Sequence, residues 1–161
     1  NGVGPGLVDP PPAAPNLAVS EAPPPALVIQ APISLGELID KITILRIKRC
    51  HLRGEALTHV QRELQVLEVT LEALGLELAA ALIERLQSVN EELWRIEAAI
   101  RAKDRQQDFG PEFIKLARSV YQQNDQRAAV KKEINRRYGS ALMEEKCYES
   151  AGEASRRLDH C

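Results

Sequence analysis

A line of polar side chains crosses a helix that should present an apolar face, and its residue types could bind an anion. Phe113, Leu116 and Val120 lead into this line at helical spacing, and Val130 leads out of it. The line passes through Gln123, Asn124 and Arg127, with Asp125 beside them. Tyr121 and Asn124 also share a neighbouring polar face, which Arg118 and Asp125 flank. Arginine and asparagine side chains three or four residues apart on a helix can donate hydrogen bonds to one carboxylate or phosphate.

A second polar line has the same helical spacing in an earlier segment. It consists of Asn90, Trp94, Glu97 and Arg101. Asp40, Lys41 and Lys48 belong to a still earlier helix and could reach the same region of a bundle. We therefore expect one polar cluster, which contains Asp40, Lys48, Glu97, Arg101, Arg118, Asn124, Asp125 and Arg127, with Lys41, Trp94 and Tyr121 beside it.

Two interpretations of this cluster stay open. Burying charged groups is costly unless they are paired and hydrogen-bonded. The cluster could be a satisfied internal network that fixes the register of the helices, or a site where the cations hold an anionic ligand or a partner. The pattern assigns no catalytic residue and indicates no cofactor. The three histidines and three cysteines lack the spacing of metal ligands, so no metal site is expected.

The elements that must position these residues are helices. Ser34 and Glu37 give the S-x-x-E start of a first helix that runs to about Arg53. A second helix is predicted over 55–74, a third follows it, and Pro111 suits the first position of a fourth. The glycines that separate them are Gly54, Gly75, Gly110 and Gly139. Since strand signals are absent, we predict an all-α bundle of about four helices.

Apolar seams on the second and third helices predict their packing. The first seam is Leu57, Val60, Leu64, Leu67, Leu71 and Leu74, and the second is Leu82, Leu86, Val89, Leu93, Ile96 and Ile100. Two heptad seams joined by a short break predict an antiparallel hairpin of these two helices, on which the bundle is built. A coiled-coil dimer through the seams is the alternative. The first helix is the most apolar, so we expect it to be central.

The proline distribution predicts where the folded domain begins. Nine of the ten prolines lie within the first 32 of the 161 residues. We predict a disordered proline-rich linker over 1–31, a helical domain over 32–149 and a flexible tail over 150–161. No apolar run is long enough for a membrane span, and the start shows no secretion signal. The odd number of cysteines fits reduced thiols in a cytoplasmic protein.

Charge is unevenly shared along the chain, whose net charge is −2. Residues 34–53 carry five basic and two acidic side chains, and residues 111–138 carry seven and three. Residues 55–97 carry three basic and nine acidic side chains. Basic helices that pack beside acidic ones are the simplest interpretation. The alternative is a basic surface for an anion or a nucleic acid, but few aromatic side chains interleave with the basic ones, which argues against nucleic acid.

Four segments together resemble an uncharacterised bacterial family that carries a domain-of-unknown-function label. They are ISLGELIDKITILRIKR, NEELWRIEAAIR, DFGPEFIKLARSVYQQNDQRAAVKKEIN and GSALMEEKCYE, and they cover Pro32 to Glu149. Arg46 stands where the family pattern has an acid. The resemblance implies a small helical bacterial protein, with a weak link to cell-surface polysaccharide and to tetratricopeptide-repeat proteins. Its motif positions include every residue of the predicted cluster, together with Lys41, Trp94 and Tyr121 beside it.

From these features we expect a non-enzymatic helical interaction or regulatory module. The proline-rich segment would tether it to a protein partner or an upstream domain, and the heptad seams also allow a homodimer. A first alternative is a binder of a small anionic metabolite, or an enzyme acting on one, that uses the arginine, lysine and glutamate cluster. A second is nucleic-acid binding through the basic helices.

Overall fold

A computed structural model describes residues 27–145 of the chain. The chain divides into two units, Asn1–Ala31 and Pro32–Cys161, and the described helices all belong to the second. Residues 27–31 contain no helix or strand. Most of the predicted linker and all of the predicted tail lie outside the described residues, so both stay predictions.

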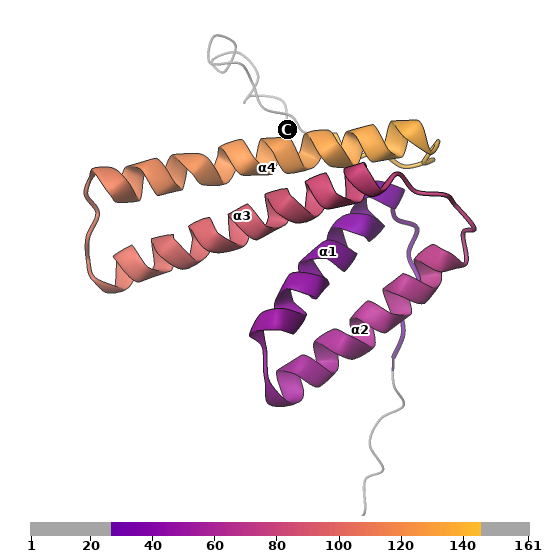
Figure 1. Cartoon of the computed structure of the whole chain (residues 1–161), viewed down its shortest axis with the longest axis horizontal. Coiled ribbons are helices and arrows are strands. Elements are labelled where there is room, and N and C mark those ends of the chain that lie inside the picture. Colours follow the sequence, from indigo (N-terminus) through magenta and orange to yellow (C-terminus); the bar gives the residue numbers. More distant parts are fainter. Residues whose placement is uncertain (1–26, 146–161) are drawn as a thin grey trace, which may run out of the picture. The chain divides into compact units, whose positions relative to one another are not determined.

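The second unit is built from helices, as predicted. In chain order they are α1 (Leu35–His51), α2 (Gly54–Glu72), α3 (Ala80–Arg105) and α4 (Pro111–Arg137). Residues 27–145 contain no strand, so the all-α bundle is confirmed (Figure 1). None of the four helices is long and apolar enough to cross a lipid bilayer.

The helices begin and end close to the predicted signals. Ser34 is the N-cap of α1, and its side-chain oxygen accepts a hydrogen bond from the Glu37 backbone N–H at 3.2 Å. Pro111 opens α4, where its missing N–H costs no hydrogen bond. After α4 the chain turns at Gly139, whose φ of 65° is a conformation that favours glycine.

Helix α1 is central, because it contacts each of the other three helices. One side of α1 packs on α2 in a cluster of Leu38, Ile42, Leu45, Val60 and Leu64. Its other side packs on α3 and α4 in a cluster of Leu35, Ile39, Leu82, Leu86, Val130 and Ile134. Ion pairs join basic α1 to acidic α2, as the charge distribution predicted, with Lys41 Nζ 2.6 Å from Glu63 and Arg46 Nη2 2.7 Å from Glu68.

The predicted hairpin of the second and third helices is wrong. The two pairs of sequence neighbours that contact each other are α1 with α2 and α3 with α4, and no helix contact joins α2 to α3 (Figure 1). The seam of α2 is used against α1, where Val60 and Leu64 are buried, and the seam of α3 is used against α1 and α4. Val60 and Leu64 are therefore buried within the domain while Leu74 is 50% exposed, and a coiled-coil dimer through the seams stays a prediction.

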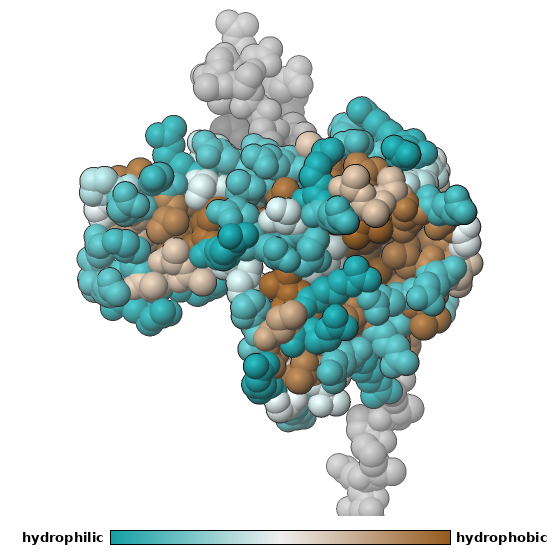
Figure 2. Space-filling view, in the orientation of Figure 1, coloured by the Kyte–Doolittle hydropathy of each residue, from teal (hydrophilic) through white to brown (hydrophobic). Residues whose placement is uncertain are grey.

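The α3–α4 hairpin is only half covered by the rest of the domain. Figure 1 shows it extending past α1 and α2 at the end where α3 turns into α4. No residue between Ile96 and Val130, a stretch that includes this projecting part, is fully buried. Ile114 and Tyr121 of α4 are more than half exposed there. In the space-filling view this arm is separated by a notch from the α1–α2 hairpin (Figure 2).

Candidate functional site

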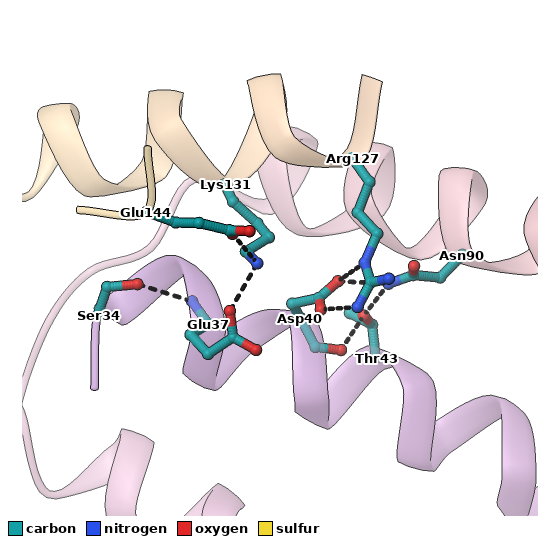
Figure 3. Close-up of polar contacts among 8 residues, drawn as sticks. All are labelled: Ser34, Glu37, Asp40, Thr43, Asn90, Arg127, Lys131 and Glu144. Atoms are coloured by element: carbon teal, nitrogen blue, oxygen red, sulfur yellow. Dashed lines mark hydrogen bonds and ion pairs between the residues drawn. The ribbon is translucent and has the colours of Figure 1, made fainter. Parts of the chain in front are cut away.

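The first candidate site is a buried polar network centred on Asp40 of α1. Asp40 is 1% exposed, and its carboxylate accepts hydrogen bonds from helices on two sides (Figure 3). Arg127 of α4 donates to both carboxylate oxygens, from Nε at 2.8 Å and from Nη2. Asn90 of α3 donates from Nδ2 to Oδ1 at 2.8 Å. One carboxylate therefore ties together α1, α3 and α4.

Thr43 completes this network. Its hydroxyl is fully buried, donates to the backbone carbonyl of Asp40 at 2.7 Å and accepts from Asn90 Nδ2 at 2.9 Å. No buried side-chain nitrogen or oxygen among residues 27–145 lacks a hydrogen-bond partner. The hydrogen bond to Asp40 raises the pKa of Arg127 against the opposing effect of burial, so Arg127 stays charged. The network is thus satisfied without any added ligand.

Lys131 lies one turn further along α4 and bridges two carboxylates. Its ammonium group is 2.6 Å from Glu37 Oε2 and also bonds to Glu144, which follows the end of α4 (Figure 3). Burial lowers the pKa of Lys131, but the hydrogen bonds to Glu144 and Glu37 outweigh burial and raise it. The predicted capping box is half present at the start of α1. The Ser34 side chain accepts a hydrogen bond from the Glu37 backbone N–H, whereas the Glu37 side chain pairs with Lys131.

A close helix approach holds the first turn of α1 in place. Gly36 N–H donates to Asn135 Oδ1 of α4 at 2.6 Å, and Leu35 N–H donates to the Ser140 hydroxyl at 3.2 Å. A Cβ on Gly36 would lie 2.6 Å from the Lys131 carbonyl oxygen, so only glycine fits there without movement. These bonds satisfy backbone donors that a helix start leaves unpaired.

A small polar cleft of about 220 Å³ opens beside the network. It is lined by Glu37, Asn124, Arg127, Ala128, Lys131 and Glu144. Both of its cations are already paired with carboxylates, Arg127 with Asp40 and Lys131 with Glu37 and Glu144. The charges that could hold an anion there are thus used within the protein. This arrangement fixes α1 on the α3–α4 hairpin and offers no nucleophile paired with a base.

The structure does not gather the predicted residues into one cluster. Asp40 and Arg127 form the network, and Asn124 lines the cleft beside it. Lys41 points to Glu63 on α2. Arg118, Tyr121 and Asp125 lie exposed on α4. The remaining four, Lys48, Trp94, Glu97 and Arg101, line a separate cleft.

Several members of the network were absent from the predicted cluster. They are Glu37, Thr43, Lys131 and Glu144, together with Asn90, which was named only on the second polar line. Helical spacing could have added three of them, because Glu37 and Thr43 lie three residues on either side of Asp40, and Lys131 lies four after Arg127. Glu144 lies beyond the helix, so no helical periodicity points to it. Arg46 bonds to Glu68 and so helps to hold α2.

The second candidate site lies where α1 ends and the α3–α4 hairpin continues. His51, the last residue of α1, stacks on Trp94 of α3 with ring centroids 5.0 Å apart and ring planes at 21°. One cleft of about 550 Å³ is lined by Lys48, Trp94, Glu97, Ala98, Arg101 and Arg105. Another, of about 700 Å³, is lined by Arg46, Ile47, Arg49, Cys50, His51, Gln87, Glu91, Trp94 and Arg95. We call the stacked pair with these two clefts the Trp94 fork.

The Trp94 fork is basic on both sides. Each cleft is lined by three lysine or arginine side chains and a single glutamate. Glu97 is occupied by Arg101 at 2.9 Å on the same helix. Among the described residues, Lys48, Arg49 and Arg105 have no carboxylate within ion-pair distance. Cations without partners around an aromatic side chain are suited to a negatively charged partner.

The sequence was compared with protein-family models, with curated proteins and with solved structures. The model of a family of unknown function, DUF6165, matches residues 29–156. The chain belongs to this family. The match spans the whole described helical unit, which confirms the expected membership of an uncharacterised family. The comparisons with curated proteins and with solved structures found no match. A bacterial origin and a polysaccharide context stay predictions.

Proposed function

We propose that the protein is a non-enzymatic interaction module whose Trp94 fork binds an acidic polypeptide segment. The observation that supports this most is the end of α1 at Trp94. Before that point α1 fills the face that α3 and α4 share, and beyond it the two helices continue without a covering helix. The clefts of the Trp94 fork open between this end of α1 and α3, and peptide segments and amphipathic helices commonly bind in grooves between helices.

The charge of the Trp94 fork favours an acidic partner. Its walls combine apolar surface from Trp94 and Ala98 with Lys48 and Arg105, cations that no carboxylate of residues 27–145 pairs with. A segment with alternating carboxylates and apolar side chains would contact both kinds of surface. Complementary charge would also speed its association.

The interior supports a structural rather than a catalytic role for the buried charges. Asp40, Arg127 and Lys131 hold one another and their neighbours in fixed pairs. We propose that this network keeps α1 in place, and that α1 in turn sets the width of the Trp94 fork. The proline-rich segment before residue 32 would serve as a tether to the partner or to another domain. We propose a cytoplasmic location, which suits the free exposed thiol of Cys50.

The single tryptophan gives a direct test. We would titrate the full chain with poly-L-glutamate and follow Trp94 fluorescence, with a thymidine oligonucleotide and polygalacturonate of matched charge as competing probes. Reversing two charges of the fork, Lys48→Glu with Arg105→Glu, should weaken poly-L-glutamate binding by about tenfold or more. The control Arg136→Glu with Arg137→Glu reverses two cations that line a different surface and should change it less than about twofold.

The three probes distinguish three classes of partner. Binding of poly-L-glutamate that the fork variant loses and the control keeps would support the proposal. An unchanged Trp94 signal, or equal weakening in both variants, would contradict it. Tighter binding of the oligonucleotide, with a steep loss in salt, would replace it with the nucleic-acid alternative. Preference for polygalacturonate would replace it with an acidic polysaccharide.

A further inference from the structure

Helix α2 has a second apolar stripe that its own domain leaves uncovered. Among the four helices, α2 contacts α1 only. Val60 and Leu64 face α1 and are buried. Val66 and Val69 are 59% and 58% exposed, and Ala73 is exposed too. Steps of three and four residues place these three on one face of the helix, away from α1.

Two charged side chains flank this stripe at opposite ends. Arg62 comes one turn before Val66, and Glu72 comes three residues after Val69. Both are exposed, and neither has an ion-pair partner among the described residues. The stripe is therefore apolar in its middle, positive at its N-terminal end and negative at its C-terminal end.

We propose that this stripe, Arg62–Ala73, is a dimerisation surface that binds the same stripe of a second copy in antiparallel orientation. A two-fold axis between Val66 and Val69 would place Val66 against the partner's Val69, and the reverse. The same axis brings Arg62 beside Ala73 of the partner subunit, within reach of the partner's Glu72. The closed interface would thereby contain two Arg62–Glu72 ion pairs, related by the two-fold axis.

The charges select this arrangement over the others. A parallel pair would place Arg62 beside the partner's Arg62 and Glu72 beside the partner's Glu72, which is repulsive at both ends. A surface that matches itself after a two-fold rotation is what a symmetric dimer requires. The stripe spans only about three helical turns, so we expect a weak dimer with a dissociation constant on the order of 10 μM or higher.

Sedimentation equilibrium of the full chain, at concentrations up to about 1 mM, tests this inference. The native chain should show a monomer–dimer equilibrium. Val66→Glu should weaken the dimer by about tenfold or more, because it places carboxylates in the apolar middle. Arg62→Glu should do the same by setting two carboxylates side by side. The double variant Arg62→Glu with Glu72→Arg restores opposite charges and should recover the native affinity.

Two controls separate loss of the dimer from loss of folding or a general effect of charge. These side chains are exposed, so each variant should keep the native melting temperature, which circular dichroism checks. Arg136→Glu reverses an exposed charge on α4 and should leave dimerisation unchanged. A native chain that stays monomeric at every concentration would overturn the inference. A dimer that Val66→Glu leaves intact, or that the double variant fails to restore, would overturn it as well. The inference does not depend on the Trp94 fork.

Discussion

Replacing Arg127 by methionine tests whether the Asp40 network carries structural stability. Among the described residues, the Asp40 carboxylate accepts three hydrogen bonds from side chains, two of which come from Arg127. Arg127→Met leaves a carboxylate that is 1% exposed with Asn90 as its remaining side-chain donor. Removing one partner of a buried ion pair costs about 3–5 kcal/mol. Because Arg127 is 27% exposed and water can follow it, we expect about 3 kcal/mol.

Urea and thermal unfolding measure this loss. For a domain of this size, about 3 kcal/mol corresponds to a melting temperature lower by roughly 15 °C. Arg118→Met makes the same substitution at an exposed position of α4 and should stay within about 0.5 kcal/mol of the native protein. The double variant Asp40→Leu with Arg127→Met removes both charges and should be more stable than the sum of the single losses by about 2 kcal/mol. A loss below about 1 kcal/mol in Arg127→Met, or strictly additive single losses, would refute the structural role of the pair.

Two further predictions concern the same contact between α1 and α4. Gly36→Ala should lower the free energy of unfolding in urea by about 2–3 kcal/mol, because the added methyl group would lie less than 3.0 Å from the Lys131 carbonyl and the Asn135 side chain. The control Gly110→Ala meets only the Asp108 side chain, at 3.3 Å, and should cost less than half as much. Equal losses of stability in the two variants would contradict the close approach of α1 to α4. The folded-state pKa of Lys131 is raised above its usual 10.5, so its stabilising effect is complete below that pH and is lost as the pH rises through the folded-state pKa. Urea unfolding at alkaline pH should therefore show a smaller loss of stability in Lys131→Met than in the native chain, and parallel losses would show that Lys131 has no such linkage.

The helices were predictable because their signals are local. Each signal acts on residues within about one helical turn of itself. Helix ends lie at or close to Ser34, Pro111 and the separating glycines. The partners of the helices were not predictable in the same way. The leucine seam of α2 shows that this helix needs an apolar partner, but α1 and α3 both offer one, and the sequence does not rank them. In the structure α2 packs on α1, whose Lys41 and Arg46 also pair with Glu63 and Glu68 of α2.

The candidate site was predictable only in part, for a related reason. Helical spacing shows which residues share a face, and it correctly placed Trp94, Glu97 and Arg101 together. It does not show how far two helices run side by side. Helix α1 ends beside Trp94, whereas α4 continues beyond that point. Periodicity alone could therefore not show whether the face that carries Arg118 meets the face that carries Asp40.

The bonds at the start of α1 have a consequence for the order in which the chain is made. The Gly36 amide is bonded to a residue 99 positions later, and the Leu35 amide to one 105 positions later. A ribosome therefore releases α1 and α2 long before the groups that fix the first turn of α1 exist. Folding of the domain must wait for the segment that ends near Glu144, and until then α1 exposes the apolar side that later packs on α3 and α4. The nascent chain would meet chaperones in that interval, as a helical hairpin with one uncovered face.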